Sequence, residues 1–245
     1  EKIGLPKDGM VSHFHPIGLQ GRFNSGCPKE CIIDVYEMNT LVGVYVVSKE
    51  SFQFILNKEG YEKYPYVPAG SSGVTVGYGY DLGQQTIAQV YADLSDLYSR
   101  ADIQRLVSVV GKRGNDARQI LGSVADISIS MESAARLAVI MKKRYANDVV
   151  TAYPKVLELH PHCQGALLSL VINRGRSLVD REGQVSRLEM RQIRDDFDTR
   201  NVHLIPSRLE AMQKYWTSDA NRGVGIRRLE EAEFFRKGLA CNCWK

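Results

Sequence analysis

Apolar residues at helical spacing run through most of the chain after residue 84, and this pattern decides its fold class. Ala134, Leu137, Met141 and Tyr145 follow one another at steps of three and four, behind Ser130 as a candidate N-cap. Such helices must bury their apolar faces against one another. Further helices are predicted near residues 85–98, 101–110, 115–122, 162–174, 187–198, 206–216 and 226–237.

An earlier helix is predicted to begin after Ser48. The Ser48 hydroxyl is a candidate N-cap. Phe52, Ile55 and Leu56 then share one apolar face, and Gly60 is placed as a C-terminal glycine would be. This helix precedes the only part of the chain with a different character.

Residues 64–83 form the one stretch rich in glycine and tyrosine. Val74, Val76 and Tyr78 alternate there with small or polar residues, which predicts a short hairpin or small sheet. We therefore expect an α+β fold that is mostly helical, with the sheet inserted after the first helix.

The N-terminal residues 1–46 differ from the rest. They carry scattered glycine and proline, with strand-like runs at 32–36 and 41–47. We interpret them as an arm or the end of a preceding domain, followed by one domain at 47–238 and a tail at 239–245. Because the chain begins with Glu1 rather than Met, we expect a processed product or a piece of a longer protein.

Composition excludes several classes. With 44% apolar and 24% charged residues of mixed sign, the 245-residue chain is not a disordered or low-complexity protein. The net charge of +4 is too small to require nucleic acid, although it suits an anionic polymer. No stretch approaches the roughly 20 apolar residues of a membrane-spanning helix.

The cysteines stand at positions 27, 31, 163, 241 and 243. An odd number in a chain of this length argues against a disulfide framework. Cys163 is interpreted as a buried small apolar residue. Cys27 and Cys31 follow His13 and His15, so a zinc site, a local disulfide and free thiols are all open for them. The pair at the tail is expected to fray.

A group of side chains around the predicted hairpin has catalytic character. Glu59 stands at the end of the first helix, where the negative end of the helix dipole favours the protonated form of a carboxyl group. A protonated Glu can donate a proton to a glycosidic oxygen. Thr75 can orient a water, Asp81 is a second carboxylate, and Tyr78 and Tyr80 offer faces for sugar rings. A capped helix beside a tight hairpin is the structural alternative.

The order of these pieces resembles a known family. A helix ending in Glu-Gly and then Thr-x-Gly-Tyr-Gly resembles the catalytic region of phage-type lysozymes, and the spacing of Thr75 and Asp81 is similar to that of the pesticin-like bacterial muramidases. Residues 165–175 are similar to the family's A-L-x-S-F-x-x-N-x-G, and residues 225–235 to its G-L-x-x-R-R-x-x-E-x-x-L-F. The resemblance covers residues 48–238.

The resemblance implies a two-lobe lysozyme-like fold and a muramidase activity. Such an enzyme cleaves the β-1,4 bond between N-acetylmuramic acid and N-acetylglucosamine in peptidoglycan, without a metal or organic cofactor. Glu59 would be the general acid, while Thr75 and Asp81 would position the water or stabilise the transition state. Tyr78 and Tyr80 are expected to bind substrate. Asn173 is assigned to substrate or, alternatively, to a buried amide that bridges the lobes.

The chain also departs from the family. Where phage enzymes carry an Asp or Cys after the catalytic Glu, this chain has Pro68 and Ala69. The second carboxylate would then be Asp81, with Glu62 or Glu50 as alternatives.

Four other residues have interpretations that do not involve catalysis. His160 and His162 are expected to be solvated capping residues at a helix start. Arg227 and Arg228 are expected to pair with acids on the last helix, and Trp216 to lie in the core or the wall of a cleft.

The resemblance also implies a biological role. We expect the lytic domain of an antibacterial toxin or effector, secreted or delivered to the periplasm or cell wall of target bacteria. Its partners would be peptidoglycan glycan strands, with an immunity protein or a delivery apparatus as further candidates. The alternatives are a phage endolysin and a catalytically dead lysozyme-fold module that only binds peptidoglycan.

Overall fold

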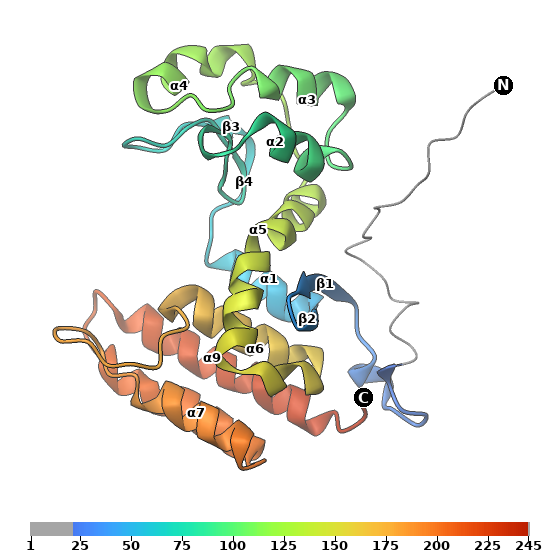
Figure 1. Cartoon of the computed structure of the whole chain (residues 1–245), viewed down its shortest axis with the longest axis vertical. Helices are drawn as coiled ribbons and strands as arrows, with labels where there is room; N and C mark the ends of the chain where they lie inside the picture. Colours follow the sequence, from blue (N-terminus) through green and yellow to red (C-terminus); the bar gives the residue numbers. More distant parts are fainter. Residues whose placement is uncertain (1–21, 245) are drawn as a thin grey trace.

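The computed structural model describes residues 22–244 and has two lobes joined by a long helix (Figure 1). The connecting helix is α5 (Met131–Ala152). The small lobe holds a three-stranded sheet and three helices, β3 (Glu62–Tyr66), β4 (Thr75–Gly77), β5 (Tyr80–Asp81), α2 (Ile87–Leu94), α3 (Arg100–Val107) and α4 (Gly114–Ile120). The predicted α+β class and the predominance of helix are confirmed.

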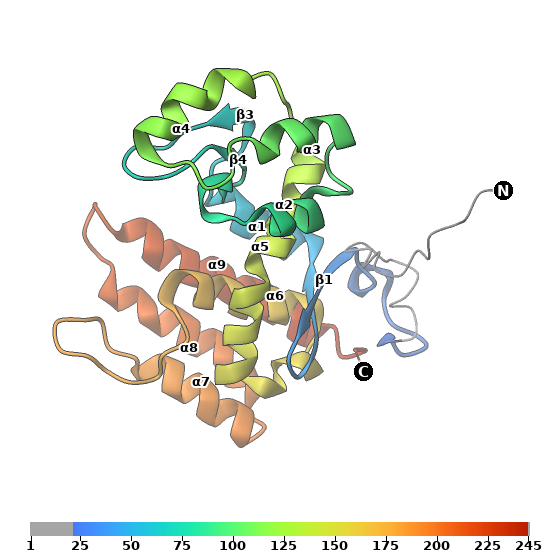
Figure 2. The same cartoon turned by 45° about the horizontal axis from the view of Figure 1, so that its top comes forward.

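The second, helical lobe collects the two ends of the described chain (Figure 2). Its core helix, α6, packs against α9, α5 and α1. The elements of this lobe are β1 (Val35–Thr40), β2 (Gly43–Ser48), α1 (Lys49–Asn57), α6 (Pro161–Arg174), α7 (Leu188–Asp198), α8 (Ile205–Ala211) and α9 (Arg222–Ala240). No helix among residues 22–244 has both the length and the apolar character needed to cross a membrane.

Local sequence signals explain where α1 begins and how closely it packs. Ser48 Oγ accepts a hydrogen bond from Ser51 N at 3.1 Å, as its N-cap role predicted. The helix ends earlier than predicted, at Asn57, with Lys58 as its C-cap, and Gly60 keeps a negative φ. Gly165 of α6 lies against this first turn; a Cβ there would stand 1.8 Å from Ser51 Oγ, so only glycine allows α1 and α6 this close.

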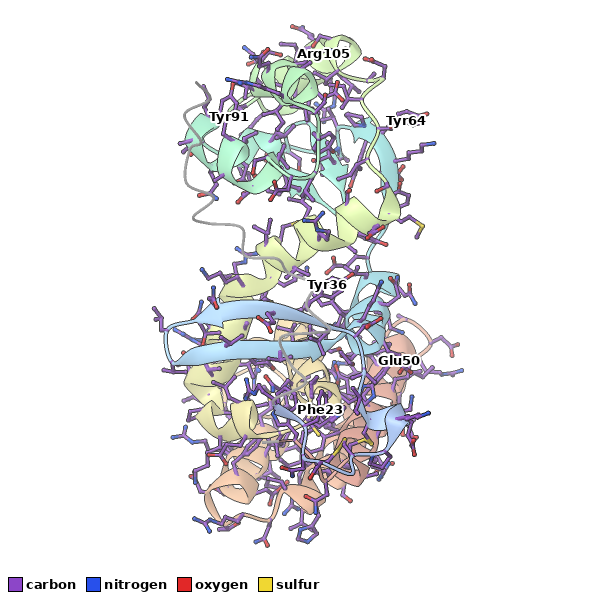
Figure 3. All side chains as sticks on the ribbon, turned by 90° about the vertical axis from the view of Figure 1, so that its right-hand side faces the viewer. Phe23, Tyr36, Glu50, Tyr64, Tyr91 and Arg105 are labelled. Atoms are coloured by element: carbon purple, nitrogen blue, oxygen red, sulfur yellow. A yellow bond between two sulfur atoms is a disulfide. The ribbon has the colours of Figure 1, made fainter. Side chains whose placement is uncertain are left out.

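The N-terminal segment is not an appendage where the structure describes it. Strands β1 and β2 pair as an antiparallel hairpin that packs on α5 and α6. Tyr45 and Val47 of β2 are fully buried, and the Tyr45 hydroxyl donates to the backbone oxygen of Gln164 at 2.6 Å. The predicted boundary at residue 46 therefore falls inside β2. Figure 3 shows the hairpin lying along the helical lobe, with Tyr36 where it faces the small lobe.

Two disulfides correct the interpretation of the cysteines. Cys27 is bonded to Cys243 and Cys31 to Cys241, so the tail is tied to the start of the described chain instead of fraying. The local Cys27–Cys31 bridge and the free thiols are wrong for these positions, and bonded sulfurs do not serve as the zinc ligands that were considered. His13 and His15 lie outside the described residues. Cys163 is a buried free thiol, as predicted.

The histidines at the start of α6 cap it, but they are not solvated. His160 Nδ1 accepts from His162 N at 3.1 Å, which confirms the capping role. Both rings are buried, and His162 Nδ1 lies 2.8 Å from Ser48 Oγ. Burial is the main cause that lowers the pKa of His162 to about 4.

The predicted hairpin of the small lobe is present as part of a sheet in the order β3-β4-β5. Val76 pairs with Tyr80, and the turn between them contains Gly77 and Gly79 at positive φ. A Cβ on Gly77 would also lie 3.3 Å from Ala134 of α5, so this glycine lets the sheet approach the connecting helix.

Candidate functional site

Glu59 lies where the chain passes from α1 into the small lobe. Lys142 of α5 donates a hydrogen bond from Nζ to Glu59 Oε1 at 2.5 Å. The pair is largely buried, with the Lys142 side chain 9% exposed and the Glu59 side chain 25% exposed. The other oxygen, Oε2, is buried and has no hydrogen-bond partner among residues 22–244. A buried carboxyl oxygen without a hydrogen bond is unusual in proteins, and it marks Glu59 as a candidate functional residue.

The sequence reasoning missed Lys142. The residue stands on the buried face of α5, four residues after Ala138 and four before Ala146, both of which are buried. A charged residue at such a position needs a partner, because an unpaired buried ammonium is strongly disfavoured. That break in the apolar pattern is the signal that would have singled out Lys142, although its partner could not be read from it.

A second cation, Arg227 of α9, lies within electrostatic range of Glu59. Burial is the main cause that lowers its pKa, and the carboxylates of Glu231 and Glu59 oppose that effect. Arg227 donates from Nε to Ser169 Oγ at 3.0 Å and lies 3.6 Å from Glu231. Two cations, Lys142 of α5 and Arg227 of α9, therefore act on the Glu59 carboxylate.

The predicted pairing of the α9 arginines with acids of their own helix is confirmed. Arg228 is fully buried and lies 2.5 Å from Glu231. Arg228 Nη1 also donates to Asn173 Oδ1 at 2.9 Å. Asn173 is exposed, and this partner belongs to the same lobe, so the interpretation of Asn173 as a buried amide that bridges the lobes is wrong. Its role in substrate binding stays a prediction.

Thr75 and Asp81 are brought together, as adjacent strands β4 and β5 pair them directly. Asp81 Oδ1 accepts from Gly73 N at 3.0 Å and Gly83 N at 2.8 Å, and Oδ2 accepts from Gln84 Nε2 at 3.1 Å. A Cβ on Gly73 would lie 2.4 Å from Gly83 Cα, so the two backbones that Asp81 joins are in close contact. The carboxylate thus orders this loop.

Thr75 is buried, and its hydroxyl donates to Gly73 O at 3.0 Å. Within residues 22–244, no hydrogen bond or ion pair joins Glu59 to Thr75 or Asp81. By their contacts, the three predicted catalytic residues fall into two groups, Glu59 with Lys142 and the strand partners Thr75 and Asp81.

The two tyrosines assigned to sugar binding belong to the core. Tyr78 is 6% exposed and packs against Tyr61, with ring centroids 5.6 Å apart. Tyr80 is 2% exposed and donates its hydroxyl proton to Asp93 Oδ2 at 2.7 Å. Burial and the Asp93 carboxylate raise the pKa of Tyr80. The prediction that these rings present faces to sugars is wrong, because the sheet turns both of them inward.

The alternative second carboxylates lie in different places. Glu62 is exposed on β3, and it and Asp81 both raise the pKa of Tyr66, an effect to which burial contributes most. Glu62 and Asp81 therefore share one neighbourhood. Glu50 belongs to the helical lobe, where Figure 3 labels it, and it pairs with Lys237 at 2.8 Å.

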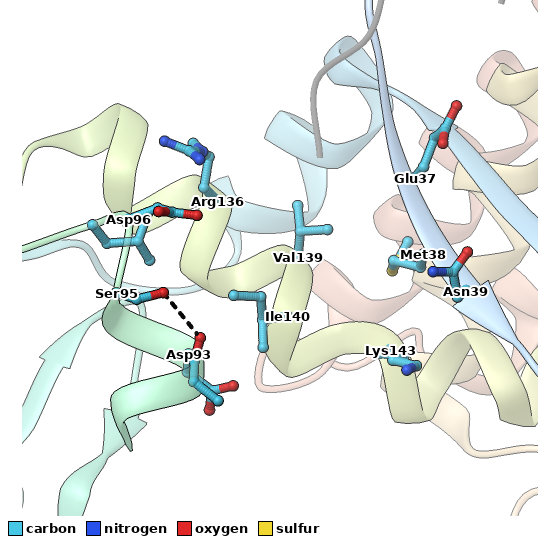
Figure 4. Close-up of a pocket in the computed structure, with 12 residues that line it drawn as sticks. Glu37, Met38, Asn39, Asp93, Ser95, Asp96, Arg136, Val139, Ile140 and Lys143 are labelled. Carbon is cyan, nitrogen blue, oxygen red and sulfur yellow. Dashed lines mark hydrogen bonds between the residues drawn. The ribbon is translucent and has the colours of Figure 1, made fainter. Parts of the chain in front are cut away.

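A pocket of about 250 Å³ lies between the lobes on another face of α5 (Figure 4). Arg136, Val139, Ile140 and Lys143 line it from α5, opposite Asp93 and Asp96 of the small lobe and Glu37 of β1. Consecutive residues of an α-helix point about 100° apart, so Lys143 and Lys142 face different sides. Neither Glu59 nor Thr75 nor Asp81 lines this pocket.

Comparison with known proteins identifies one similar domain but assigns no activity to it. A family model described as "Domain of unknown function (DUF8812)" matches residues 57–156. The match contains Glu59, Thr75, Asp81 and Lys142 and ends after α5, so it covers the small lobe and the connecting helix. A search of curated proteins found no match. The chain is thus similar, over residues 57–156, to a domain whose function the description leaves open.

Proposed function

We propose that the chain is a muramidase with a lysozyme-like two-lobe fold, which hydrolyses the β-1,4 bond between N-acetylmuramic acid and N-acetylglucosamine. The observation that carries the proposal is the position and the hydrogen bonding of the Glu59 side chain. It lies at the junction of the lobes, where one carboxylate oxygen accepts from Lys142 and the buried second oxygen has no partner in the described part of the chain. The resemblance of the Glu-Gly and Thr-x-Gly-Tyr-Gly segments supports the same assignment.

In this mechanism Glu59 donates a proton to the glycosidic oxygen as the bond breaks. A water adds to the anomeric carbon, and the proton that this water releases returns Glu59 to its acid form. The ammonium group of Lys142 stabilises the carboxylate that proton transfer leaves behind, because opposite charges in a poorly solvated site attract strongly. Lys142 is therefore a positioning residue in the proposal.

The second group supports this chemistry through the loop of the small lobe. Asp81 holds residues 73 and 83 together, and Thr75 stands opposite it on the neighbouring strand. Asp81 Oδ1 accepts two hydrogen bonds, whereas Oδ2 accepts only that of Gln84, so Oδ2 can accept one more from a catalytic water. Glu62, exposed and in the same neighbourhood, is the alternative carboxylate.

A turbidity assay on purified cell walls tests the proposal. Glu59→Gln keeps the size of the side chain but cannot donate a proton, so turnover should fall by about 10²–10⁴-fold. Circular dichroism and sedimentation with walls should show an unchanged fold and unchanged wall binding. Wild-type clearance by Glu59→Gln would refute the mechanism.

Two further variants identify the second carboxylate. Asp81→Asn should be severely impaired and Glu62→Gln should clear walls normally, which makes Glu62→Gln the matched control for loss of one negative charge. The reverse result would transfer the role to Glu62.

A binding module without turnover is the second candidate. The three hydrogen bonds that Asp81 accepts from its own loop favour it, because they give that carboxylate a purely structural use. This candidate predicts that wild type and Glu59→Gln bind walls equally and that neither reduces turbidity.

The two disulfides support a site of action outside the cytoplasm, since such bonds persist in oxidising compartments. We accordingly propose action in the periplasm or cell wall. A role as a toxin domain or as an endolysin, and an immunity or delivery partner, remain predictions.

A further inference from the structure

A pocket of about 260 Å³ at the C-terminal end of α6 is lined by arginines. Asn173 and Arg174 of α6 contribute to it, and the loop that leads into α7 adds Arg187. Trp216 and Val224 complete the wall next to α9. The sequence had suggested functional or wall positions only for Asn173 and Trp216; it gave no sign that Arg174 and Arg187 would line a pocket with them.

The two arginines of the pocket have no carboxylate partner in the part of the chain that the structure describes. Arg174 donates from Nη2 to Ser186 O at 3.1 Å, and its guanidinium carbon lies 5.2 Å from the centroid of the Trp216 ring. Arg187 donates from Nη1 to the Met190 sulfur at 3.2 Å. These contacts fix the orientation of both guanidinium groups without neutralising them.

The acids near the pocket already have partners. Glu189 lies 2.6 Å from Lys214 and accepts from the Tyr215 hydroxyl at 2.8 Å. Asp180 lies 3.1 Å from Arg191 and accepts from the backbone N of Arg187 at 2.6 Å. Glu189 and Asp180 are within electrostatic range of Arg174 and Arg187, respectively. Their ion pairs are with Lys214 and Arg191, however, so this region keeps a net positive charge.

A third guanidinium group, that of Arg228, acts on Arg174 from outside the pocket lining, and its own charge is balanced by Glu231. Burial, followed by the charges of Arg187 and Arg228, lowers the pKa of Arg174 to about 10. A partly desolvated guanidinium group next to two others is unfavourable unless an anion joins them. Asn173 also lines the pocket, and its Oδ1 accepts from Arg228 Nη1 at 2.9 Å.

We propose that this pocket binds an oxyanion of the substrate, a carboxylate of the peptide stem carried by N-acetylmuramic acid. Arginine matches the planar geometry of a carboxylate with paired hydrogen bonds. This inference rests on the proposed function, which supplies the glycan strand. The pocket also connects to Glu59 through neighbouring side chains, because Asn173 contacts Arg228, Glu231 contacts both Arg228 and Arg227, and Arg227 lies in range of Glu59.

Phosphate has the same charge and a related shape, so the experiment must separate the two sources. Trp216 lines the pocket, and the chain has only one other tryptophan, Trp244. In the Trp244→Phe background the fluorescence therefore reports on the pocket alone. The probes are a disaccharide muropeptide with its stem peptide, the same disaccharide without the peptide, and inorganic phosphate.

We expect the muropeptide to cause a saturable fluorescence change in the parent protein. The dissociation constant should be at least about tenfold higher for Arg174→Met and for Arg187→Met, because each variant loses a charged hydrogen bond. Arg187→Lys keeps a charge without the paired donors and should lie in between, which guards against a variant that fails to fold. Arg181→Met is the matched control, because Arg181 is an exposed arginine of the same loop that does not line the pocket.

Three outcomes would overturn the inference. Equal binding of the disaccharide with and without its peptide would show that the stem is not recognised. A response to phosphate alone would assign the pocket to a phosphate-bearing polymer. Unchanged binding in both methionine variants would remove the arginines from the site.

Failure of this inference is distinguishable from failure of the proposed function, because binding is measured without turnover. A muropeptide that binds through the arginines to a chain that clears no walls would refute the muramidase and retain the pocket.

Discussion

The nested disulfides predict a specific pattern of stability loss. Cys27–Cys243 and Cys31–Cys241 span 216 and 210 residues of sequence. Whichever bridge is present alone closes a loop of more than two hundred residues, for which the chain-entropy relation gives about 5 kcal/mol. The other bridge then closes only the ring of residues 27–31 and 241–243, which the same relation values at about 2.5 kcal/mol.

Removal of either bridge should therefore lower the free energy of unfolding by only about 2.5 kcal/mol, whereas removal of both should lower it by about 8 kcal/mol. The two losses are not additive, because each bridge alone retains the large loop. Alanine is the suitable replacement, as these cysteines are mostly buried and behave as small apolar side chains.

Urea unfolding, followed by far-ultraviolet circular dichroism, measures these losses in the two double variants and the quadruple variant. Reduction of the wild-type chain with dithiothreitol should reproduce the quadruple variant. Two equal losses that sum to the loss of the quadruple variant would refute the reasoning. A quadruple variant as stable as either double variant would refute it as well.

Three other predictions concern the helical lobe. In the folded state the pKa of His162 is lowered to about 4, whereas an unfolded histidine titrates near 6.5. Between these pH values the unfolded state binds more protons than the folded state. The free energy of unfolding should therefore be highest above pH 6.5 and fall by about 3 kcal/mol as the pH drops to 4. Urea unfolding across that range should show this slope, and His162→Asn should flatten it. Gly165→Ala should destabilise the fold by about 1–3 kcal/mol through the clash with Ser51, while Gly223→Ala, which meets open space in α9, should be neutral or stabilising; equal melting temperatures would contradict the close packing of α1 and α6. Tyr45→Phe should cost about 1 kcal/mol, because it removes the buried hydrogen bond from the Tyr45 hydroxyl to the Gln164 carbonyl. An unchanged unfolding midpoint would show that the hairpin is not seated on α6.

The position of Glu59 in the sequence was a useful guide to the candidate site, but its electrostatic environment was not predictable. From the sequence, Glu59 was expected at the end of a helix, and the helix dipole was the only electrostatic influence that could be inferred for it. In the structure the nearest charge is the Lys142 ammonium group, 83 residues away. Local reasoning treats the dipole as the main influence, whereas a direct ion pair in a largely buried place is stronger.

The tyrosines show the same limit on a smaller scale. Alternation along β4 predicted a strand, and the strand is present. Which face of the sheet meets solvent depends on what packs against it. Other side chains pack over the sheet near Tyr78 and Tyr80, so both rings are buried. Strand periodicity indicates that two faces exist without indicating which face is exposed.

What the sequence by itself determined is the local structure. The helical spacing after residue 84, the Ser48 cap and the glycine-rich turn between β4 and β5 each depend on residues within a few positions of one another, so the pattern is sufficient to predict them. Only the tertiary structure decided the seating of the β1–β2 hairpin, the partners of the cysteines and the contact of Lys142 with Glu59. Each of these depends on the packing of segments far apart in the chain, and such packing is set by the summed burial of many side chains rather than by any local pattern.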